Sequence, residues 1–392
     1  MRKGWEYKKL GEVLETTSGG TPSKSHKEYY EGGTIPWLRS GEVSKGDIYD
    51  AELYITEEGL KKSSAKLFPI DTVLIAMYGA TVGQVGILKS TMCTNQAICG
   101  ILPNKDFHPN FLKYVLLANK KNYLKQAMGG AQPNISQQVI KSTYIPIVKF
   151  SEQESVVSEL DKINELIRLK KEQLKDFDNL AQSLFYEMFG DPVENEKGWE
   201  VHLLKALCTK IGSGATPKGG SESYKEEGTS LIRSLNIHNN EFKFKDLAYI
   251  DDDQADSLNN VIVQRNDVLL NITGASVARC CIVPSEVLPA RVNQHVCILR
   301  HGNLIDAKYL NRLLTNDNYQ QLLQRLAKSK AATREALPKS IVDKLSIPLP
   351  PLSLQRLFAQ RIEQIEREKS EVQKSIQDLE TLLASRMQYW FE

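Results

Sequence analysis

The chain has 392 residues, of which 41% are hydrophobic and 25% charged, and its formal net charge is +2. This composition is ordinary for a globular protein of two or three domains, and the net charge alone predicts no polyanionic partner. Apolar runs stay well short of the ~18 residues of a membrane-spanning helix, so we expect a cytoplasmic protein without a membrane partner. The six cysteines form no Cys-x-x-Cys pair, so we expect buried thiols and no metal site.

The first half of the chain predicts two kinds of structure in order. Residues 1–150 mix short β-branched runs with Gly and Pro, which is typical of an α+β domain, and Pro109 to Met128 has the pattern of an amphipathic helix. Residues 151–190 then carry apolar side chains in alternating steps of four and three, the spacing of a coiled-coil seam. A helix from Ser151 to Phe189 would be about 58 Å long at ~1.5 Å per residue.

The second half repeats the first. "GWEYKKLGEVLETTSGGTPSK" from Gly4 returns as "GWEVHLLKALCTKIGSGATPKG" from Gly198, and "VLIAMYGATVGQVGI" from Val73 returns as "VLLNITGASVARCCI" from Val268. "NQAIC" likewise returns as "NQHVC", and "YIPIV" as "SIPLP". We therefore expect a second α+β domain at residues 191–352, with its own amphipathic helix from Asp306 to Leu326, and a second long helix at residues 353–392.

The predicted fold class is α+β, with two globular domains in tandem repeat, separated by two long α-helices that form an antiparallel coiled coil. Antiparallel pairing is expected because each domain precedes its own helix and the two seams have equal length and register. The expected helix–helix interface consists of Val156, Leu160, Ile163, Ile167, Leu174, Phe177, Leu184 and Met188 on the first helix, and Phe358, Ile362, Ile365, Val372, Ile376, Leu379, Leu383 and Trp390 on the second.

Basic residues collect at the end of each globular domain. Lys113 to Lys141 contains five lysines and no acid, and Lys308 to Lys344 contains eight basic residues against three acids. The first helix, with nine acids and five bases, is a poor surface for phosphates. A basic helix is commonly just a solvated face, but a repeated basic segment beside polar loops favours nucleic-acid binding.

Side chains that match the hydrogen-bonding edges of bases, or that bind phosphates, occur in these loops and basic segments. Alternatively, the Thr-Pro and Asn-Gln pairs among them satisfy turns and strand ends. The candidates are Thr21, Lys24, Arg39, Ser40, Thr81, Asn95, Gln96, Lys120, Lys121, Gln132 and Asn134 in the first copy, and Thr216, Lys218, Arg233, Ser234, Ser276, Asn293, Gln294, Lys328, Lys330 and Arg334 in the second.

The signatures of common catalytic sites are missing from the sequence. It contains no Gly-Lys dipeptide of a phosphate-binding loop, no Gly-x-Gly-x-x-Gly fingerprint, no Asp/Asn-Pro-Pro-aromatic tetrad of an amino-methyltransferase and no Pro-Asp pair of a nuclease site. The six histidines lack metal-ligand spacing. We therefore expect no catalytic residue, no metal and no cofactor in this chain.

The chain resembles the DNA sequence specificity subunits (HsdS) of type I restriction-modification systems. The resemblance spans its whole length and is carried by "SGGTPSK", "IPWLRSGEV", "LIAMYGATVGQVGIL", "TNQAICGILPN", "QPNIS" and "SIPLPPLSLQ". It implies two target recognition domains that each read half of a split site in double-stranded DNA, and helices that set the spacer and dock two methyltransferase subunits. Restriction (translocase) subunits would complete the complex, and S-adenosylmethionine, ATP and Mg²⁺ would bind the partner subunits.

Two departures occur inside the repeat. "QPNIS" becomes "TREAL" at Thr333 to Leu337, and "GQVG" becomes "ARCC" at Ala278 to Cys281. They lie where two half-site readers should differ. Two other interpretations stay open at this point. A structural coiled-coil adaptor would not need two near-copies of a loop-rich basic domain, and a fused restriction-modification enzyme would need the missing methyltransferase tetrad.

Overall fold

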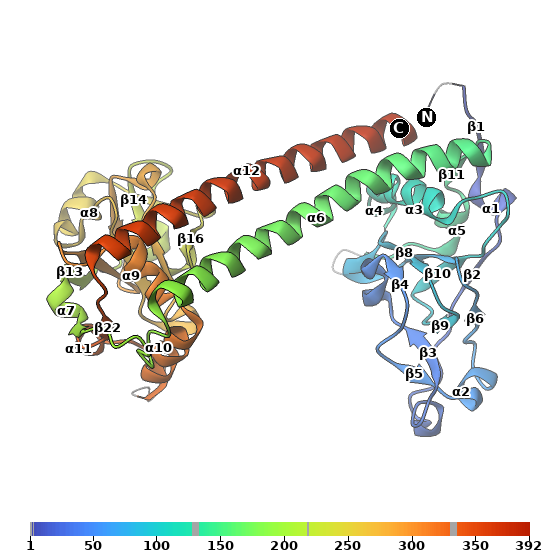
Figure 1. Ribbon diagram of the computed structural model, residues 1–392. Coiled ribbons are helices and arrows are strands. Elements are labelled where there is room, and N and C mark those ends of the chain that lie inside the picture. The colour runs from blue at the N-terminus through green and yellow to red at the C-terminus, as the bar shows by residue number, and fades with distance from the viewer. Residues whose placement is uncertain (1, 3, 128–132, 218, 330–334) are drawn as a thin grey trace. The chain divides into compact units, whose positions relative to one another are not determined.

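The computed structural model describes residues 2, 4–127, 133–217, 219–329 and 335–392. The chain divides into two compact units, Met1–Lys171 with Lys374–Glu392, and Glu172–Gln373. In each unit, one globular domain packs against a segment of both long helices (Figure 1). The predicted fold class is confirmed. Among the described residues, no helix is long and apolar enough to span a bilayer.

The first globular domain (domain 1) contains three sheets, with strand orders β1-β11, β2-β10-β7-β8-β4 and β5-β3-β9-β6. The strands are β1 (Glu6–Lys9), β2 (Thr16–Ser18), β3 (Ile35–Leu38), β4 (Asp47–Ile48), β5 (Tyr54–Ile55), β6 (Leu67–Phe68), β7 (Val73–Ala76), β8 (Val85–Leu88), β9 (Met92–Thr94), β10 (Ile98–Ile101) and β11 (Tyr144–Ile147). The helices are α1 (Leu10–Val13), α2 (Glu57–Lys61), α3 (Pro109–Ala118), α4 (Lys120–Gln126) and α5 (Gln137–Lys141), with 3₁₀ turns η1 (Lys27–Tyr29), η2 (Ser40–Lys45) and η3 (Gly79–Thr81).

The second globular domain (domain 2) repeats this plan with strand orders β12-β22, β13-β21-β18-β19 and β17-β14-β20, and adds a small β15-β16 hairpin. The strands are β12 (Val201–Leu203), β13 (Cys208–Ser213), β14 (Thr229–Ile232), β15 (Ile237–His238), β16 (Glu241–Phe242), β17 (Ala248–Ile250), β18 (Val268–Asn271), β19 (Cys280–Ile282), β20 (Ala290–Val292), β21 (Val296–His301) and β22 (Ser346–Pro348). The helices are α7 (Leu204–Leu207), α8 (Asp252–Ser257), α9 (Ala307–Leu314), α10 (Asp317–Ser329) and α11 (Lys339–Val342), with 3₁₀ turns η4 (Gly220–Ser223), η5 (Ser234–Asn236), η6 (Asn259–Val261), η7 (Gly274–Ser276) and η8 (Ser285–Val287).

Apolar runs without polar alternation form the middle of each main sheet. Every residue of β7 and β10 is buried, as is every residue of β18. A strand buried on both faces reads as a continuous hydrophobic run, which explains why "VLIA" and "VLLN" lack the alternation of a half-exposed strand. These strands position the turns that follow them.

The expectation of one amphipathic helix near the end of each domain is wrong in detail. The first is two helices, α3 and α4, that meet at Asn119, and the second is α9 and α10, separated at Thr315 and Asn316. Asn119 turns its side chain back to the carbonyl of Val115 at 2.9 Å, which is the local competition that makes Asn a frequent helix end. Met128, the expected end of the first helix, lies outside the described residues.

The long helices are α6 (Phe150–Phe189) and α12 (Leu352–Phe391), each of 40 residues. In the first unit, Arg386 contacts Glu159, with Nη2 to Oε2 at 3.0 Å, and Lys171 contacts Glu380 at 2.8 Å. As the residue number rises along α6 it falls along α12, so the helices run antiparallel. In the second unit, the ion pair between Lys369 of α12 and Asp178 of α6 follows the same antiparallel order.

The seam side chains face inward in both units, although to different degrees. Val156, Leu160, Ile163, Ile167 and Leu184 of α6, and Phe358, Ile362, Ile365, Val372 and Ile376 of α12, are buried. Leu174, Phe177, Met188, Leu379, Leu383 and Trp390 are partly buried. The seam continues into the globular cores, because Val156 and Leu160 belong to the domain 1 core, and Phe358 and Ile362 to that of domain 2. Helix and domain therefore share one apolar core in each unit.

A buried glutamine joins each helix to its domain. Gln153 Oε1 accepts from the backbone N–H of His108 at 2.8 Å, and its Nε2 donates to the carbonyls of Asp106 and Val148. Gln355 makes the equivalent three bonds, to the N–H of Asp306 and to the carbonyls of Leu304 and Pro350. Both side chains are fully buried. We refer to these two sets of bonds as the glutamine brackets.

We expect Gln153→Leu to destabilise the first unit by about 1–3 kcal/mol, because the buried N–H of His108 loses its acceptor while the side-chain volume is nearly kept. The measurement is urea unfolding followed by tryptophan fluorescence, since Trp5, Trp37 and Trp390 lie in that unit. Gln377→Leu, at an exposed position of α12, is the control. Equal midpoints for both variants would show that the bracket contributes nothing.

The turn that follows β7 in domain 1, and the equivalent turn that follows β18 in domain 2, each contain a residue with a left-handed backbone conformation. Gly83 has φ +76°, and its counterpart Ala278 has φ +73°, an uncommon conformation for a residue with a Cβ. A Cβ at Gly83 would lie 3.0 Å from Cγ of Lys120. Domain 2 therefore tolerates local strain that domain 1 avoids.

Gly83→Ala should cost about 1 kcal/mol of stability, from the left-handed φ and the close approach of Lys120. Gly41→Ala is the matched control, because Gly41 does not have a positive φ and no atom lies within 4 Å of the added Cβ. Reduced unfolded-state entropy makes that control neutral or slightly stabilising. The measurement is the thermal unfolding midpoint of both variants. An equal decrease of the midpoint in Gly83→Ala and Gly41→Ala would contradict the strain argument.

Candidate nucleic-acid interface

In each domain, the Thr-Pro loop that follows the first strand of the main sheet meets the Asn-Gln turn. Thr21 Oγ1 donates to Gln96 Oε1 in domain 1, and Thr216 Oγ1 donates to Gln294 Oε1 in domain 2. Two candidate pairs that are far apart in sequence are thus brought together, and in the same way in both copies.

The same turn also touches the end of the neighbouring sheet. The N–H of Asn95 donates to the carbonyl of Leu38 at 2.9 Å, and that of Asn293 to the carbonyl of Ile232 at 3.1 Å. Arg39 and Ser40 follow Leu38 directly, as Arg233 and Ser234 follow Ile232. The Asn-Gln turn therefore lies beside the Arg-Ser pair in each domain.

Two further segments lie beside the Asn-Gln turn in each domain: the one that leads into η3 or η7, and the one that contains Pro133 or Glu335. The segment before η3 bonds the turn, with the N–H of Met77 donating to the carbonyl of Ala97 at 2.8 Å, and Ile272 repeats this bond to His295 at 2.9 Å. The N–H of Gly79 donates to the carbonyl of Pro133, next to Asn134, and that of Gly274 to Glu335. Thr81 and Ser276 end η3 and η7. We call this set of converging loops the loop cluster of each domain.

Several candidate side chains have intramolecular partners. Asn95 and Asn293 turn inward, where their Oδ1 atoms accept from the N–H of Ala97 and His295, so both hold the turn together. Arg39 bonds Glu52 at 2.6 Å, and this contact holds the pKa of the Glu52 carboxyl below its ordinary value. The other arginine, at position 233, packs over the ring of Tyr224 and donates to the carbonyl of Asp246.

Two of the candidate lysines, Lys120 and Lys328, lie next to residues of the loop cluster. Lys120 lies against Gly83, Lys121 and Lys24 are exposed, and Lys328 approaches Glu335 at 3.8 Å. Gln132, Lys218, Lys330 and Arg334 lie outside the described residues.

Two residues in the domain 2 cluster were missed by the sequence analysis. Arg279 and His295 help to line a hollow of about 310 Å³ together with Ser234, Leu235, Thr273 and Ser276. Their counterparts in domain 1 are Gln84 and Ala97. The change from Gln84 to Arg279 is part of the departure from "GQVG" to "ARCC", and comparing "NQAIC" with "NQHVC" position by position would have revealed the histidine.

Hydrogen bonds fix one wall of this hollow. Thr216 donates to Oε1 of Gln294, which leaves Gln294 Nε2 facing His295 Nε2 at 3.2 Å. An amide nitrogen only donates, so His295 Nε2 accepts, and the protonated Nδ1 donates to Thr273 Oγ1 at 2.6 Å. The hydroxyl hydrogen of Thr273 is then free to donate to another group.

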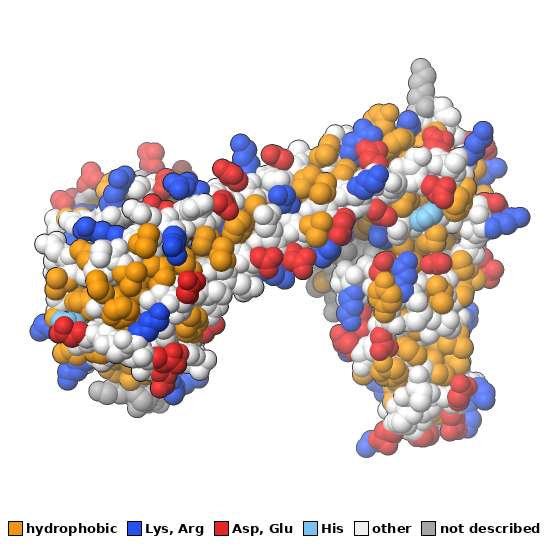
Figure 2. Space-filling view, viewed as in Figure 1, with side chains coloured by type: hydrophobic (Ala, Val, Ile, Leu, Met, Phe, Trp, Pro, Cys, Tyr) orange, Lys and Arg blue, Asp and Glu red, His pale blue; other side chains and the backbone are white. Residues whose placement is uncertain are grey.

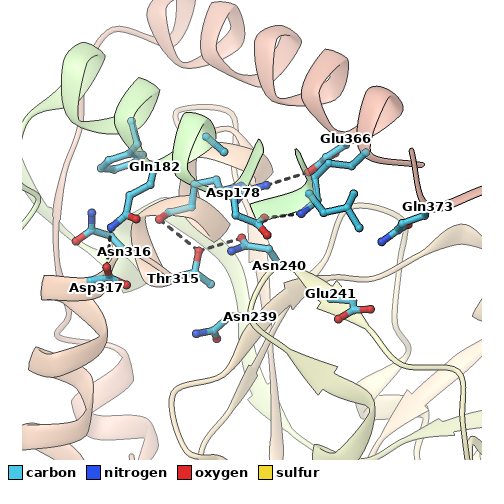
Figure 3. A pocket seen from close by; sticks show the side chains of 15 residues that line it. Asp178, Gln182, Asn239, Asn240, Glu241, Thr315, Asn316, Asp317, Glu366 and Gln373 are labelled. Carbon is cyan, nitrogen blue, oxygen red and sulfur yellow. Dashed lines mark hydrogen bonds and ion pairs between the residues drawn. The ribbon is translucent and has the colours of Figure 1, made fainter. Parts of the chain in front are cut away.

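A second hollow, of about 570 Å³, lies where α6 and α12 meet domain 2 (Figure 3). Its polar side chains largely bond one another. Asp178 bonds Lys369, Gln182 donates to Asp317 at 2.6 Å, and Thr315 donates to Asn240 at 3.0 Å. Glu366 accepts from Arg312 at 3.4 Å. This internal pairing identifies the hollow as a joint between helix and domain.

The described cysteines are poor ligands and nucleophiles. Five of them are buried, and burial raises the pKa of Cys93 to about 11 and that of Cys281 to about 12. Within the described ranges, no cluster of three His, Cys, Asp or Glu residues has the geometry of a metal site.

Comparison with known proteins gives a consistent result. Residues 2–176 and 196–381 match the type I restriction modification DNA specificity domain. The chain is 32% identical over 233 residues to the type I restriction enzyme MjaIX specificity subunit of Methanocaldococcus jannaschii, covering 54% of this chain and 53% of that protein. The match thus spans about half the length of that relative.

Two further matches extend over nearly the whole chain. The MjaVIII specificity subunit of the same organism is 22% identical over 413 residues, covering 97% of this chain and 92% of the relative. A solved structure that concerns complex assembly and conformational transition of the type I R-M system has a TM-score of 0.65 at 21% identity, covering 100% of this chain and 98% of that one. At that identity the likeness shows a shared fold.

Proposed function

The chain belongs to the family of type I restriction-modification DNA specificity domains, and from this premise we propose that domains 1 and 2 each read one half of a bipartite site in double-stranded DNA. The loop clusters are the reading surfaces, and α6 and α12 set the length of the unread spacer. This places the chain in the cytoplasm, where the DNA lies. The alternative function, a structural adaptor without sequence-specific DNA binding, is not favoured, because the relatives of this chain are specificity subunits.

One observation carries the proposal. Both domains build the loop cluster with the same bonds, yet they place different side chains at equivalent positions, such as Gln84 against Arg279 and Ala97 against His295. A shared backbone frame with exchanged polar side chains is what two readers of different short sequences require, because base edges differ in the pattern of their donors and acceptors.

The chain itself performs no chemistry under this proposal. Methyl transfer belongs to two methyltransferase subunits that bind S-adenosylmethionine, and cleavage to restriction (translocase) subunits that use ATP and Mg²⁺. The contribution of this chain is binding and positioning. Lys120 and Lys121 bind phosphate oxygens beside the cluster, which adds affinity without sequence information.

The proposal is tested by expressing the chain with its modification subunit and mapping the methylated adenines. We expect one split motif with two defined halves. Lys120→Ala with Lys121→Ala should weaken DNA binding about equally for all sequences, and should reduce the slope of log affinity against log salt by about 1 per lysine. Binding without any sequence preference in the parent complex would refute the proposal.

The outward faces of the long helices carry a repeated surface. Asp176, Leu180 and Ser183 of α6 recur as Asp378, Leu382 and Ser385 of α12. All six are exposed, and the two leucines are 51% and 45% exposed. Their spacing of four and three places each trio on one helix face. Hydrophobic side chains reach the surface among charged ones along these helices (Figure 2).

Because the two trios lie in different units, they offer two equivalent docking surfaces for two methyltransferase subunits. Leu180→Asp or Leu382→Asp alone should reduce the complex from two methyltransferases per chain to one, and the double variant should bind none. Mass measurement of the purified complex shows the stoichiometry. Leu169→Asp is the control, since Leu169 is exposed on α6 but its counterpart is Glu371. Two methyltransferases retained by the double variant would rule out these surfaces.

A further inference from the structure

We infer that the hollow beside Arg279 binds the major-groove edge of a guanine in the half-site read by domain 2, with Arg279 donating to its O6 and N7. This inference rests on the proposed function. It names a base and a residue where the family resemblance supplies neither.

The hollow combines one donor-only group, the Arg279 guanidinium, with hydroxyls that can donate or accept. Arg279 is a half-buried residue, and no described residue pairs with its guanidinium by a hydrogen bond or an ion pair. A guanidinium offers donors only. The Thr273 hydroxyl has a hydrogen left to donate, and the hydroxyls of Ser234 and Ser276 line the same space. Because Arg279 can only donate and the hydroxyls can adapt to either role, a ligand that presents acceptors beside Arg279 fits the hollow.

Guanine is the base that meets this requirement. In the major groove it presents two adjacent acceptors, whereas adenine presents an acceptor and a donor, cytosine presents a donor, and thymine an acceptor beside a methyl group. A phosphate also presents acceptors, but Leu235, which is 43% exposed, adds apolar surface to the hollow, and this suits the flat edge of a base better than a charged group.

The equivalent position in domain 1 supports a reading role. Gln84 occupies the place of Arg279, and glutamine pairs with adenine through one donor and one acceptor. In domain 2, one wall is a chain of hydrogen bonds through Thr216, Gln294, His295 and Thr273. Domain 1 repeats only the first bond, from Thr21 to Gln96, because Ala97 stands where domain 2 has the histidine. The histidine wall is thus specific to domain 2, and it is held in place before DNA binds.

The test uses the full chain in complex with its modification subunit. Arg279→Gln places the domain 1 residue in domain 2, Arg279→Lys keeps the charge but loses the two-pronged geometry, and Arg265→Gln removes an exposed arginine outside the hollow. Methylated motifs are mapped for each complex. Competition binding then uses duplexes varied at every position of both half-sites.

We expect Arg279→Gln to lower the preference for guanine at one position of one half-site by about tenfold to a hundredfold, with the other half-site unchanged. Arg279→Lys should weaken the same preference, and Arg265→Gln should behave as the parent. A parent motif with no G·C pair in either half, unchanged preferences in Arg279→Gln, or uniform weakening over all sequences would each overturn the inference. In all three results the parent still reads a split site, so the proposed function would stand.

Discussion

The glutamine brackets determine how the rest of each unit can be arranged. One amide supplies an acceptor and two donor hydrogens, and in the fully buried side chains of Gln153 and Gln355 all three are used on backbone groups. A rotation of the domain about the start of its helix would break these bonds inside an apolar core. The helix therefore leaves each domain in one direction.

That constraint separates a fixed frame from a variable surface. Hydrogen bonds between segments repeat in the two copies, from the buried glutamine brackets to the exposed contact between the Thr-Pro loop and the Asn-Gln turn. Differences gather at the loop clusters, where Ala278 even keeps the left-handed backbone of Gly83. Because the frame carries the stability, side chains at the cluster can change with little effect on the core.

Each long helix likewise has one face buried in the seam and one face that is exposed. Their seam continues into both domain cores, so each helix segment is stabilised by packing against the domain as well as against the other helix. In the first unit, the stacking of Trp5 on Trp390 at 6.0 Å joins the start of the chain to the end of α12. The outward face stays exposed, and an exposed leucine recurs there at Leu180 and Leu382.

The sequence by itself determined the tandem repeat, the two long helices with their seam and the α+β character of the domains. These features depend on local periodicity and on self-similarity, which a single chain displays directly. The loop segments that carry the candidate residues could also be found in this way.

Only the tertiary structure decided which groups those residues contact. It turned Asn95 and Asn293 inward, paired Arg39 with Glu52, broke the predicted amphipathic helices in two, and placed Arg279 beside His295 in a hollow. These outcomes depend on hydrogen bonds between segments far apart in the chain. Such bonds form between whichever partners the packed core brings within about 3 Å, and the order of residues does not encode that distance.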